Sequence, residues 1–518
     1  MGKGRLQNSI KNLASGFLSR FLIIILGMVV RTIFIKTLGN EYLSVNGLYS
    51  NILNMLSLAE LGFGTAMVFS MYKPLAENDQ DKLASLLDLY KKVYRVIGFV
   101  ILGLGLCIIP FMGFIIKDPP NIEHLTFYYV LFLVNTVLSY WFFAYKRSIL
   151  VADQREYICT NYHNVCNVLK SFVQIVVLLI VHDFTLYLII QLGFTVAENI
   201  VIARYTDKIY PAFSQQQIVP LPKNDLNEIW KNVKALMFSR LGHVILNSTD
   251  NIIISAFVGI TWVGLLSNYT LIIDSVTGVL CAITSALSAS LGNYFVEKSK
   301  EESYLLFKRV EFLNSWLYGF SAICLLVLLN PFVTLWLGSE YTLSKCIVTA
   351  LTLNFFVQGY MNTLWTFRST LGLFTQGWIR PLIVSAVNII ASILLGIKFG
   401  TFGVLFATFI ARASVNLWYD PWIIHKFGFG KSVRSFFKMY FFRVLEILSI
   451  LVIVEGFKFF LMRNGVTTFN FIILMFATVV MTLVMFWAYS RKRDEYSYFC
   501  NVVKSIIFSL IQKKNFHR

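Results

Sequence analysis

The amino-acid sequence predicts an all-α polytopic membrane protein with about 14 transmembrane helices, arranged as two six-helix lobes plus two C-terminal helices. Two properties of the whole chain indicate this fold class: 57% of its 518 residues are hydrophobic, and its mean hydropathy is +0.67. The third observation is that long apolar stretches recur from one end to the other. A helix of about 20 apolar residues crosses roughly 30 Å of hydrocarbon, and these stretches have that length.

Fourteen apolar windows follow one another, and each is expected to form one span. The first seven cover residues 13–35, 43–71, 93–116, 125–145, 160–181, 184–203 and 235–257. The next seven cover residues 263–291, 312–329, 347–371, 381–399, 402–424, 441–460 and 469–489.

The net charge of +18 follows the predicted topology and does not indicate nucleic-acid binding. Lys and Arg crowd alternate loops, whereas the opposite loops hold few basic residues. The crowded loops contain Lys3, Arg5 and Lys11, then Lys91, Lys92 and Arg95, then Lys146, Arg147 and Arg155, and later Lys298, Lys300, Lys308 and Arg309. This asymmetry is the positive-inside pattern, and with an even number of spans it predicts that both termini are cytoplasmic.

The longest loop divides the first six spans from the next six. It contains Pro211, Pro220 and Pro222, as expected of a linker. We therefore expect a first lobe, a cytoplasmic linker, a second lobe, helices 13 and 14, and a cytoplasmic tail. Their boundaries are 1–204, 205–234, 235–426, 427–490 and 491–518.

The sequence repeats itself across this linker. Five matches stay in register at offsets of 217–222 residues. They pair Ser19-Arg20 with Ser239-Arg240, Leu38-Gly39 with Val258-Gly259, Gly47 with Gly264, Tyr72 with Tyr294, and Gly98 with Gly319. Six spans per unit preserve orientation, so the repeat is parallel. It predicts two facing lobes around a central cavity, the arrangement expected for alternating access.

Cations inside apolar stretches indicate a polar function within the membrane. A charge at the bilayer centre costs at least about 2.5–3.5 kcal/mol, so such residues usually face a watered cavity. Three lie deep, namely Arg31, Lys170 and Arg412. Three lie near the cytoplasmic boundary, where long side chains can snorkel, namely Arg20, Arg240 and Arg368. Guanidinium and ammonium groups bind phosphate oxygens, so these six are the candidate cargo-binding residues, with pairing to buried acids as the alternative.

The acids within the spans are fewer. They are Glu60 near the centre of the second window, Asp250 and Asp274 in windows seven and eight, and Glu198 closer to the cytoplasm. They either neutralise cations such as Arg31 and Arg412 or serve in coupling, by carrying a proton or binding Na⁺. The repeat aligns Arg31 with Asn251, next to Asp250, and this predicts a cavity that is asymmetric in charge.

No catalytic or metal-binding motif is recognisable, and we expect neither an enzyme nor a cofactor. The segment Gly428-Phe429-Gly430-Lys431-Ser432 resembles the end of a Walker A loop, but His425 stands where its first glycine belongs. The six histidines and seven cysteines show no ligand spacing. Two segments, Asp81–Lys92 and Tyr496–Lys513, are amphipathic and are expected to lie along the lipid headgroups.

Several strings resemble the polysaccharide flippases of the Wzx-like branch of the multidrug/oligosaccharidyl-lipid/polysaccharide exporter superfamily. They are Leu56-Ser57-Leu58-Ala59-Glu60-Leu61-Gly62-Phe63-Gly64, Tyr72-Lys73-Pro74-Leu75, Ala152-Asp153-Gln154-Arg155-Glu156-Tyr157-Ile158, Thr249-Asp250-Asn251-Ile252-Ile253-Ile254-Ser255 and Ser267-Asn268-Tyr269-Thr270. The likeness covers nearly the whole chain. It implies a V-shaped pair of six-helix lobes around a cationic cavity.

The resemblance also implies the activity: a flippase in the cytoplasmic membrane of a bacterium that translocates an undecaprenyl-pyrophosphate-linked oligosaccharide for capsule or another surface polysaccharide. Glycosyltransferases and a polymerase of the same pathway are the implied partners. Family members use arginines of spans 1, 7 and 8. Here span 1 supplies Arg20 and Arg31 and span 7 supplies Arg240, but span 8 offers Asp274 and no arginine. The alternatives are a flippase for teichoic-acid precursors or lipid II, and a cation-coupled drug antiporter.

Overall fold

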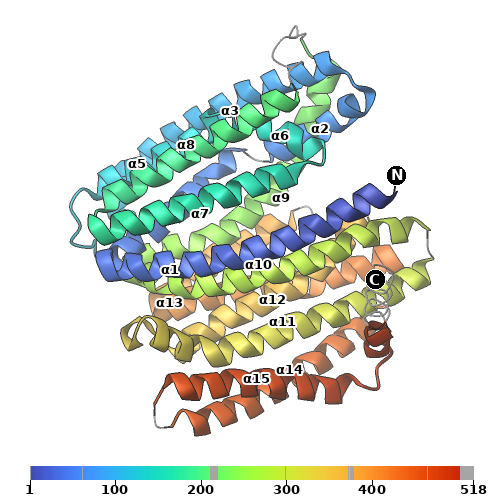
Figure 1. Ribbon diagram of the computed structural model, residues 1–518. Helices are drawn as coiled ribbons and strands as arrows, with labels where there is room; N and C mark the ends of the chain where they lie inside the picture. Colours follow the sequence, from blue (N-terminus) through green and yellow to red (C-terminus); the bar gives the residue numbers. More distant parts are fainter. Residues whose placement is uncertain are drawn as a thin grey trace, which may run out of the picture. The chain divides into compact units, whose positions relative to one another are not determined.

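The computed structural model describes residues 2–60, 62–210, 220–297, 299–371, 373, 379–463, 465–501 and 504. The side chains of residues 2–21, 59, 235, 236, 238–240, 243, 247 and 285–297 are outside this description. Within these ranges the chain forms helices and no strand, which confirms the predicted all-α class (Figure 1).

The helices follow one another with short connections. The first half contains α1 (Gly2–Leu56), η1 (Ser57–Glu60), α2 (Phe63–Glu77), α3 (Gln80–Ile108), η2 (Ile109–Phe111), α4 (Met112–Ile115), α5 (Leu125–Trp141), η3 (Ala144–Lys146), α6 (Arg147–Ala152), α7 (Glu156–Ile180) and α8 (Phe184–Ile209). The second half contains α9 (Lys223–Ile253), η5 (Ile254–Val258), α10 (Ile260–Glu297), α11 (Lys300–Trp336), η6 (Ser339–Tyr341), α12 (Lys345–Thr370), α13 (Arg380–Ile423), η7 (Ile424–Phe429), α14 (Arg434–Leu461) and α15 (Thr468–Ser490).

Eight helices of the described chain are long and apolar enough to cross a membrane, or nine if the bent pair α5 and α6 counts as one span. One of these eight, α13, covers the predicted spans 381–399 and 402–424 through a kink at Gly400, and α1 continues through a kink at Gly39 from the first predicted span into the second. Gly39 has a φ of 87° and Gly400 a φ of 61°, in the left-handed region that favours glycine. The chain therefore turns back at these glycines without a loop.

Two glycine pairs of the predicted repeat have comparable surroundings, and the repeat itself stays a prediction. Gly259, which the repeat pairs with Gly39, also has a positive φ, of 145°, and separates η5 from α10. Gly47 of α1 lies against Val263, and its repeat partner Gly264 lies against Ser44. Gly47 and Gly264 thus allow α1 and the start of α10 to approach closely.

The chain divides into two compact units, and α10 and α13 contribute to both. One unit comprises Met1–Asn268 with Trp378–Val404, and the other comprises Tyr269–Gly377 with Leu405–Arg518. The start of α13 belongs to the first unit because it packs on α9, where Ser385 donates a hydrogen bond to the carbonyl of Gly242 at 2.8 Å. The lobe boundaries expected from the sequence lie at other positions and stay a prediction.

The first unit is held together by α1, which packs against α7 and α9, and by the neighbouring helices α3, α5 and α8 (Figure 1). An aromatic cluster joins α1, α5 and α8 at one end. It consists of Phe34, Tyr42, Tyr128, Phe184 and Tyr187, with ring centroids 4.9–6.2 Å apart. These contacts fix the first turns of α8 relative to the kinked part of α1.

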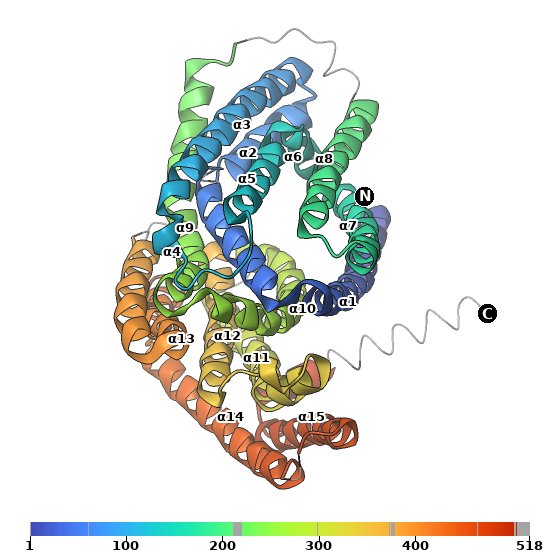
Figure 2. The same ribbon diagram turned by 90° about the vertical axis from the view of Figure 1, so that its left-hand side faces the viewer.

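The second unit is built on α11, which packs against α12, α14 and α15. Ile323 and Val327 of α11 meet Ile450 and Val454 of α14 and Leu474 of α15 in one buried cluster. In Figure 2, α14 and α15 lie beside each other along this unit. Helices 13 and 14 of the prediction are therefore integral to the packing of the second unit.

The amphipathic segment Asp81–Lys92 was wrongly expected at the headgroups, whereas most of Tyr496–Lys513 lies outside the described residues. Asp81–Lys92 is the first part of α3, and its apolar side chains are buried in the protein: Leu83, Leu86, Leu87 and Tyr90. The described start of the C-terminal tail packs on α11, where Arg309 lies 3.8 Å from the centroid of Tyr498 and Phe499 stacks near Phe312. Amphipathic periodicity cannot distinguish a protein face from a headgroup face, and here protein covers it.

Candidate functional site

Arg31 lies half-buried on α1 in the first unit. Its Nη1 donates a hydrogen bond to the Oγ of Ser267, 2.6 Å away on α10, and Tyr187 is close enough to interact with its charge. Among the described side chains, no carboxylate forms an ion pair with it. The predicted deep cation is thus held in place by a hydroxyl, and no carboxylate of the described part of the chain neutralises it.

Lys170 lies half-buried near the middle of α7 in the same unit. The nearest acid that influences it is Glu198 of α8, yet the Glu198 carboxylate is 3.0 Å from Nδ1 of His163. No ion pair to Lys170 occurs among the described side chains. Glu198, in the C-terminal half of α8, is therefore a direct partner of His163 and forms no ion pair with the lysine.

Arg31 and Lys170 belong to helices that pack side by side (Figure 2). Arg31 precedes the kink at Gly39 by eight residues, about 12 Å along the helix, and Lys170 precedes the end of α7 at Val181 by eleven, about 16 Å. The two cations therefore lie at similar distances before the ends of these two helical segments. Neither of them forms an ion pair among the described side chains.

Arg368 and Arg412 in the second unit have structural partners. Arg368 Nη1 is 3.1 Å from Oδ1 of Asp420, which is fully buried, and its Nε donates to the carbonyl of Leu373 at 3.0 Å. Arg412 is only 6% exposed, and its Nη1 donates to the carbonyl of Asn354 at 3.1 Å. These contacts tie α12 to α13, so both arginines contribute to packing in this conformation.

Four further predicted site residues are Arg20, Arg240, Asp250 and Asp274. The side chains of Arg20 and Arg240 lie outside the described residues. Asp250 is half-buried on α9 and has interaction partners, and Asp274 is exposed on α10. Neither Asp250 nor Asp274 forms an ion pair with Arg31 among the described side chains.

The sequence predicted that Glu60 lies inside a continuous helix, and this is wrong. It ends η1, a 3₁₀ turn that separates α1 from α2, and Gly62 after it has a φ of 80°. Tyr94 of α3 donates its hydroxyl to Glu60 Oε1 at 2.9 Å, and Tyr90 donates to Tyr94 at 2.8 Å. In the sequence, only the spacing of Tyr90 and Tyr94 by one helical turn indicated that the two side chains could act on the same partner.

A buried ion pair in the second unit escaped prediction. Arg443 of α14 donates to the carboxylate of Glu311 on α11, and Ser315 also donates to Glu311 at 2.7 Å. Arg443 is 5% exposed and Glu311 1%. The sequence contained both residues as a single arginine in the window 441–460 and a glutamate just before the window 312–329, but nothing in it linked the two. The ion pair holds α14 against α11.

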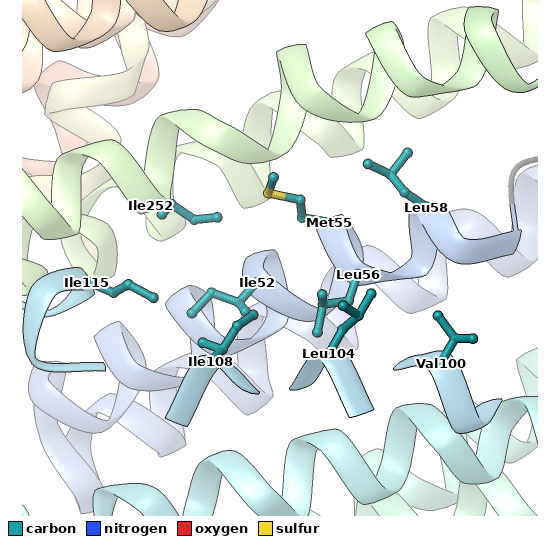
Figure 3. Close-up of a pocket in the computed structure, with 9 residues that line it drawn as sticks. All are labelled: Ile52, Met55, Leu56, Leu58, Val100, Leu104, Ile108, Ile115 and Ile252. Carbon is teal, nitrogen blue, oxygen red and sulfur yellow. The ribbon is translucent and has the colours of Figure 1, made fainter. Parts of the chain in front are cut away.

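The first unit also contains an apolar pocket of about 470 Å³ between α1, η1, α3, α4 and α9 (Figure 3). It is lined by Ile52, Met55, Leu56, Leu58, Val100, Leu104, Ile108, Ile115 and Ile252. No lining residue carries a charge or a hydrogen-bonding side chain. The pocket can therefore accommodate hydrocarbon and offers nothing to a phosphate or a sugar.

Three solved structures show the same fold. A structure of "Lipid II flippase MurJ, inward closed conformation" matches with a TM-score of 0.62 and 18% identity, over 92% of this chain and 98% of that one. A multidrug resistance MATE family transporter of the MOP superfamily matches at 0.58 and 16%, over 77% and 96%. A point mutant of the MATE transporter VcmN of Vibrio cholerae matches at 0.55 and 13%, over 80% and 96%.

Sequence comparison adds nothing to this: no protein-family model matches the chain, and no curated protein matches it. The structural matches extend over most of both chains and, for the flippase, over nearly the full length. The chain therefore has the fold of the MOP-superfamily transporters.

Proposed function

We propose that this protein is a flippase that translocates an undecaprenyl-pyrophosphate-linked oligosaccharide across the cytoplasmic membrane of a bacterium by alternating access. The observation that carries the proposal is the pair Arg31 and Lys170, two cations on neighbouring helices of the first unit without a carboxylate partner among the described side chains. The transporter fold supports it, since this fold moves cargo across membranes in its solved examples.

The chemistry of the two cations favours a phosphorylated headgroup. A guanidinium presents five N–H donors in a plane that matches phosphate oxygens, and Arg31 has one of them engaged with Ser267. Lys170 adds a point charge that can follow a second phosphate. A pyrophosphate would thus contact Arg31 in a fixed orientation and Lys170 through a flexible stem.

The proposed site is narrower than the six cations predicted from the sequence. We leave Arg368 and Arg412 out of the proposed cargo site, because Arg368 is paired with buried Asp420 and Arg412 is only 6% exposed. Arg20 and Arg240 stay candidates on the basis of the resemblance alone. The polyprenyl tail would remain in lipid, since a hydrocarbon chain gains nothing from a cationic surface.

Reconstituted vesicles provide the test. Purified protein is inserted into liposomes that contain a fluorescent undecaprenyl-pyrophosphate oligosaccharide, and the label is quenched from outside over time. Wild-type protein is expected to move the label between leaflets, and Arg31→Gln to reduce that rate. If no pyrophosphate-linked glycolipid moves faster than in empty liposomes, the proposed function is wrong.

Cargo identity separates the nearest alternatives. A flippase for lipid II or for teichoic-acid precursors would use the same phosphate contacts, and the structural match to a lipid II flippase supports it equally. Translocation rates measured in parallel for vesicles that contain an oligosaccharide lipid, lipid II or a teichoic-acid precursor would show which cargo the protein prefers. Adjacent genes for glycosyltransferases and a polymerase would favour capsule or another surface polysaccharide.

A cation-coupled drug antiporter is the second candidate function. The MATE matches and the carboxylate of Glu60 favour it. An antiporter of cationic drugs needs acidic groups at its cargo site, whereas Arg31 and Lys170 would repel such drugs. Increased drug resistance on overexpression, lost in Glu60→Gln, would support the antiporter over the flippase.

A further inference from the structure

The connection from η7 to α14 in the second unit is built around one tyrosine. Tyr304 lies one turn into α11 and is 9% exposed. Its ring centroid is 5.3 Å from that of Phe429 and 5.7 Å from that of His425, both on η7, which packs against α11. Its hydroxyl lies 3.4 Å from the Oγ of Ser435, in the first turn of α14. Tyr304 therefore links α11, η7 and α14.

The segment Gly428–Ser432, which resembles the end of a Walker A loop, forms this connection. Gly430 has a φ of 66°, in the left-handed region, and the N–H of Lys431 donates to the carbonyl of His425 at 2.9 Å. The Ser432 hydroxyl accepts from the N–H of Arg434 at 3.3 Å. A nucleotide-binding loop instead follows a strand and directs its backbone N–H groups at phosphates. The segment therefore connects two helices and is not a nucleotide loop.

Two lysines from distant parts of the chain converge on the ring of Tyr304. The Nζ atom of Lys308, one turn further along α11, lies 5.1 Å from the ring centroid, and the Nζ atom of Lys431 lies 4.6 Å from it. The two ammonium nitrogens cannot be farther apart than the sum of these distances. Since like charges repel, this convergence raises the local positive potential. We call Tyr304, Lys308 and Lys431 the Tyr304 site.

The ammonium groups of the Tyr304 site can still bind an anion. Each ammonium carries three N–H donors, whereas a ring face attracts the charge without offering an oxygen or nitrogen acceptor. Lys431 is exposed and Lys308 is half-buried. Of the acids in the first turn of α11, Glu302 is engaged with Ser299 in a capping box and Glu301 is exposed. Phosphate oxygens can therefore accept from these lysines without displacing the ring.

Aromatic side chains next to this site favour a lipid as the source of the anion. Trp418 of α13 is 51% exposed and Phe427 of η7 is 47% exposed. The Nζ atom of Lys426 lies 4.7 Å from the ring centroid of Trp422 and 5.4 Å from that of Phe427. Exposed aromatic rings beside lysines are typical of the boundary between hydrocarbon and headgroups. An anion that reaches this turn of the chain is therefore expected to carry apolar tails.

We propose that Lys308 and Lys431, aligned by the ring of Tyr304, bind the phosphate group of an anionic membrane phospholipid. The ammonium groups donate to the phosphate oxygens, and the acyl chains lie along the exposed aromatic surface of Trp418 and Phe427. The bound phosphate neutralises two like charges where α11, η7 and α14 meet, so the lipid stabilises the second unit. This binding does not depend on which cargo the protein moves.

Native mass spectrometry of the purified full-length protein tests the site, with phosphatidylglycerol titrated into the detergent. The double variant Lys308→Gln, Lys431→Gln is expected to bind this lipid at least about tenfold more weakly, since each lysine near an anionic lipid surface contributes roughly fivefold. The matched control is Lys300→Gln, Lys438→Gln, which removes the same charge from exposed positions of α11 and α14 and should bind as the wild type does. Unchanged binding in the first variant, or equal weakening in both, would overturn the proposal.

Substitutions of Tyr304 test the alignment of the lysines. Tyr304→Phe retains the ring and should retain binding, whereas Tyr304→Leu removes the ring without changing the charge and should weaken binding. Because Tyr304 is buried, the thermal midpoint of each variant shows whether it is folded. Folded Tyr304→Leu protein that binds as tightly as the wild type would remove the ring from the site. Glu297 of α10, whose side chain lies outside the described residues, is tested as well: weaker binding in Glu297→Gln would contradict a site made of cations.

A comparison of ligands tests the lipid assignment. Phosphatidylcholine, which has the same phosphate and tails but no net charge, should bind more weakly than phosphatidylglycerol. Inorganic phosphate in large excess should not displace the lipid. If it does, with the same dependence on Lys308 and Lys431, the site binds a free anion and the lipid assignment is wrong.

Thermal unfolding tests the effect on the second unit. Phosphatidylglycerol should raise the thermal midpoint of the wild type and not that of the Lys308→Gln, Lys431→Gln variant, because a ligand that binds only the folded state stabilises it. An equal rise in both would overturn the proposal. Vesicle transport separates this proposal from the function proposed above. If the wild type binds phosphatidylglycerol through these lysines but moves no glycolipid, the proposed function fails alone.

Discussion

The guanidinium of Arg31 donates to the hydroxyl of Ser267 across 2.6 Å, which joins the middle of α1 to α10 within the first unit. Ser267 in turn donates to the carbonyl of Gly264 at 2.7 Å, so its oxygen is oriented toward the arginine. Because the partner is neutral, this contact positions the guanidinium and leaves its charge intact. Arg31 differs in this respect from Arg368, whose charge is neutralised by a carboxylate.

Arg31→Gln is expected to slow glycolipid translocation at least about tenfold. A hydrogen bond to a charged group contributes about 1.5–3 kcal/mol, and 1.4 kcal/mol corresponds to a factor of ten. Ser267→Ala should cost less, roughly twofold to tenfold, because it only releases the orientation of the arginine. Initial rates in vesicles measure both. Equal rates for wild type and Arg31→Gln would remove Arg31 from the site.

Lys170→Met is expected to weaken cargo binding, whereas Lys170→Arg should retain most of it, because the charge and not the shape of the ammonium group is used. The readout is the glycolipid concentration that gives half-maximal translocation. Lys117 provides a control, since its ammonium group already donates to the carbonyl of Phe257 at 3.1 Å. A loss in Lys117→Met equal to that in Lys170→Met would indicate a general charge effect.

Arg368→Gln is expected to reduce the amount of folded protein more than the activity per folded molecule. Asp420 is fully buried, and breaking a buried pair by removing one partner costs about 3–5 kcal/mol. Asp420→Asn in the same chain should restore part of the stability, because no unpaired charge is then left. Thermal unfolding in detergent measures this. If the Arg368→Gln protein is as stable as the wild type but inactive, Arg368 would have to be counted among the cargo-binding residues.

Gly264→Ala is expected to destabilise the protein by about 1–3 kcal/mol, the usual cost of overpacking. A Cβ at this position would overlap the hydroxyl of Ser44 and approach Asn40. Gly103→Ala, with nothing within 4 Å of the added carbon, should be neutral or stabilising because alanine favours helix. The thermal midpoints of the two variants in the same detergent decide this. Similar midpoints would contradict the close approach of α1 and α10.

Hydropathy predicted the helical class and most spans, because burial in lipid requires long apolar segments. It could not predict where a span is interrupted. The window 43–71 contains the break at Glu60, yet Ser57–Gly64 is apolar apart from Ser57 and Glu60, and an apolar composition does not report the left-handed backbone at Gly62. The kink at Gly39 lay between two windows, so its position was readable although its geometry was not.

The candidate site was predictable only in part, because charge in a span does not reveal its partner. Arg31, Arg368 and Arg412 look alike in sequence, but their partners are Ser267, Asp420 and the carbonyl of Asn354. Each partner lies far away in the chain, so spacing along the sequence carries no information about it. The same reason hid Glu311, which pairs with Arg443 across 132 residues.

The contact between Glu311 and Arg443 also has a consequence for the order in which the chain enters the membrane. α14 carries Arg443, Glu446, Glu455 and Lys458, and it is not among the helices of the described chain that are apolar enough to cross alone. The charge of Arg443 is neutralised by Glu311 only when α11 is already present. During synthesis, Glu311 would remain without its arginine until α14 is made, more than a hundred residues later. A chain truncated before α14 would therefore contain a buried carboxylate without its ion-pair partner.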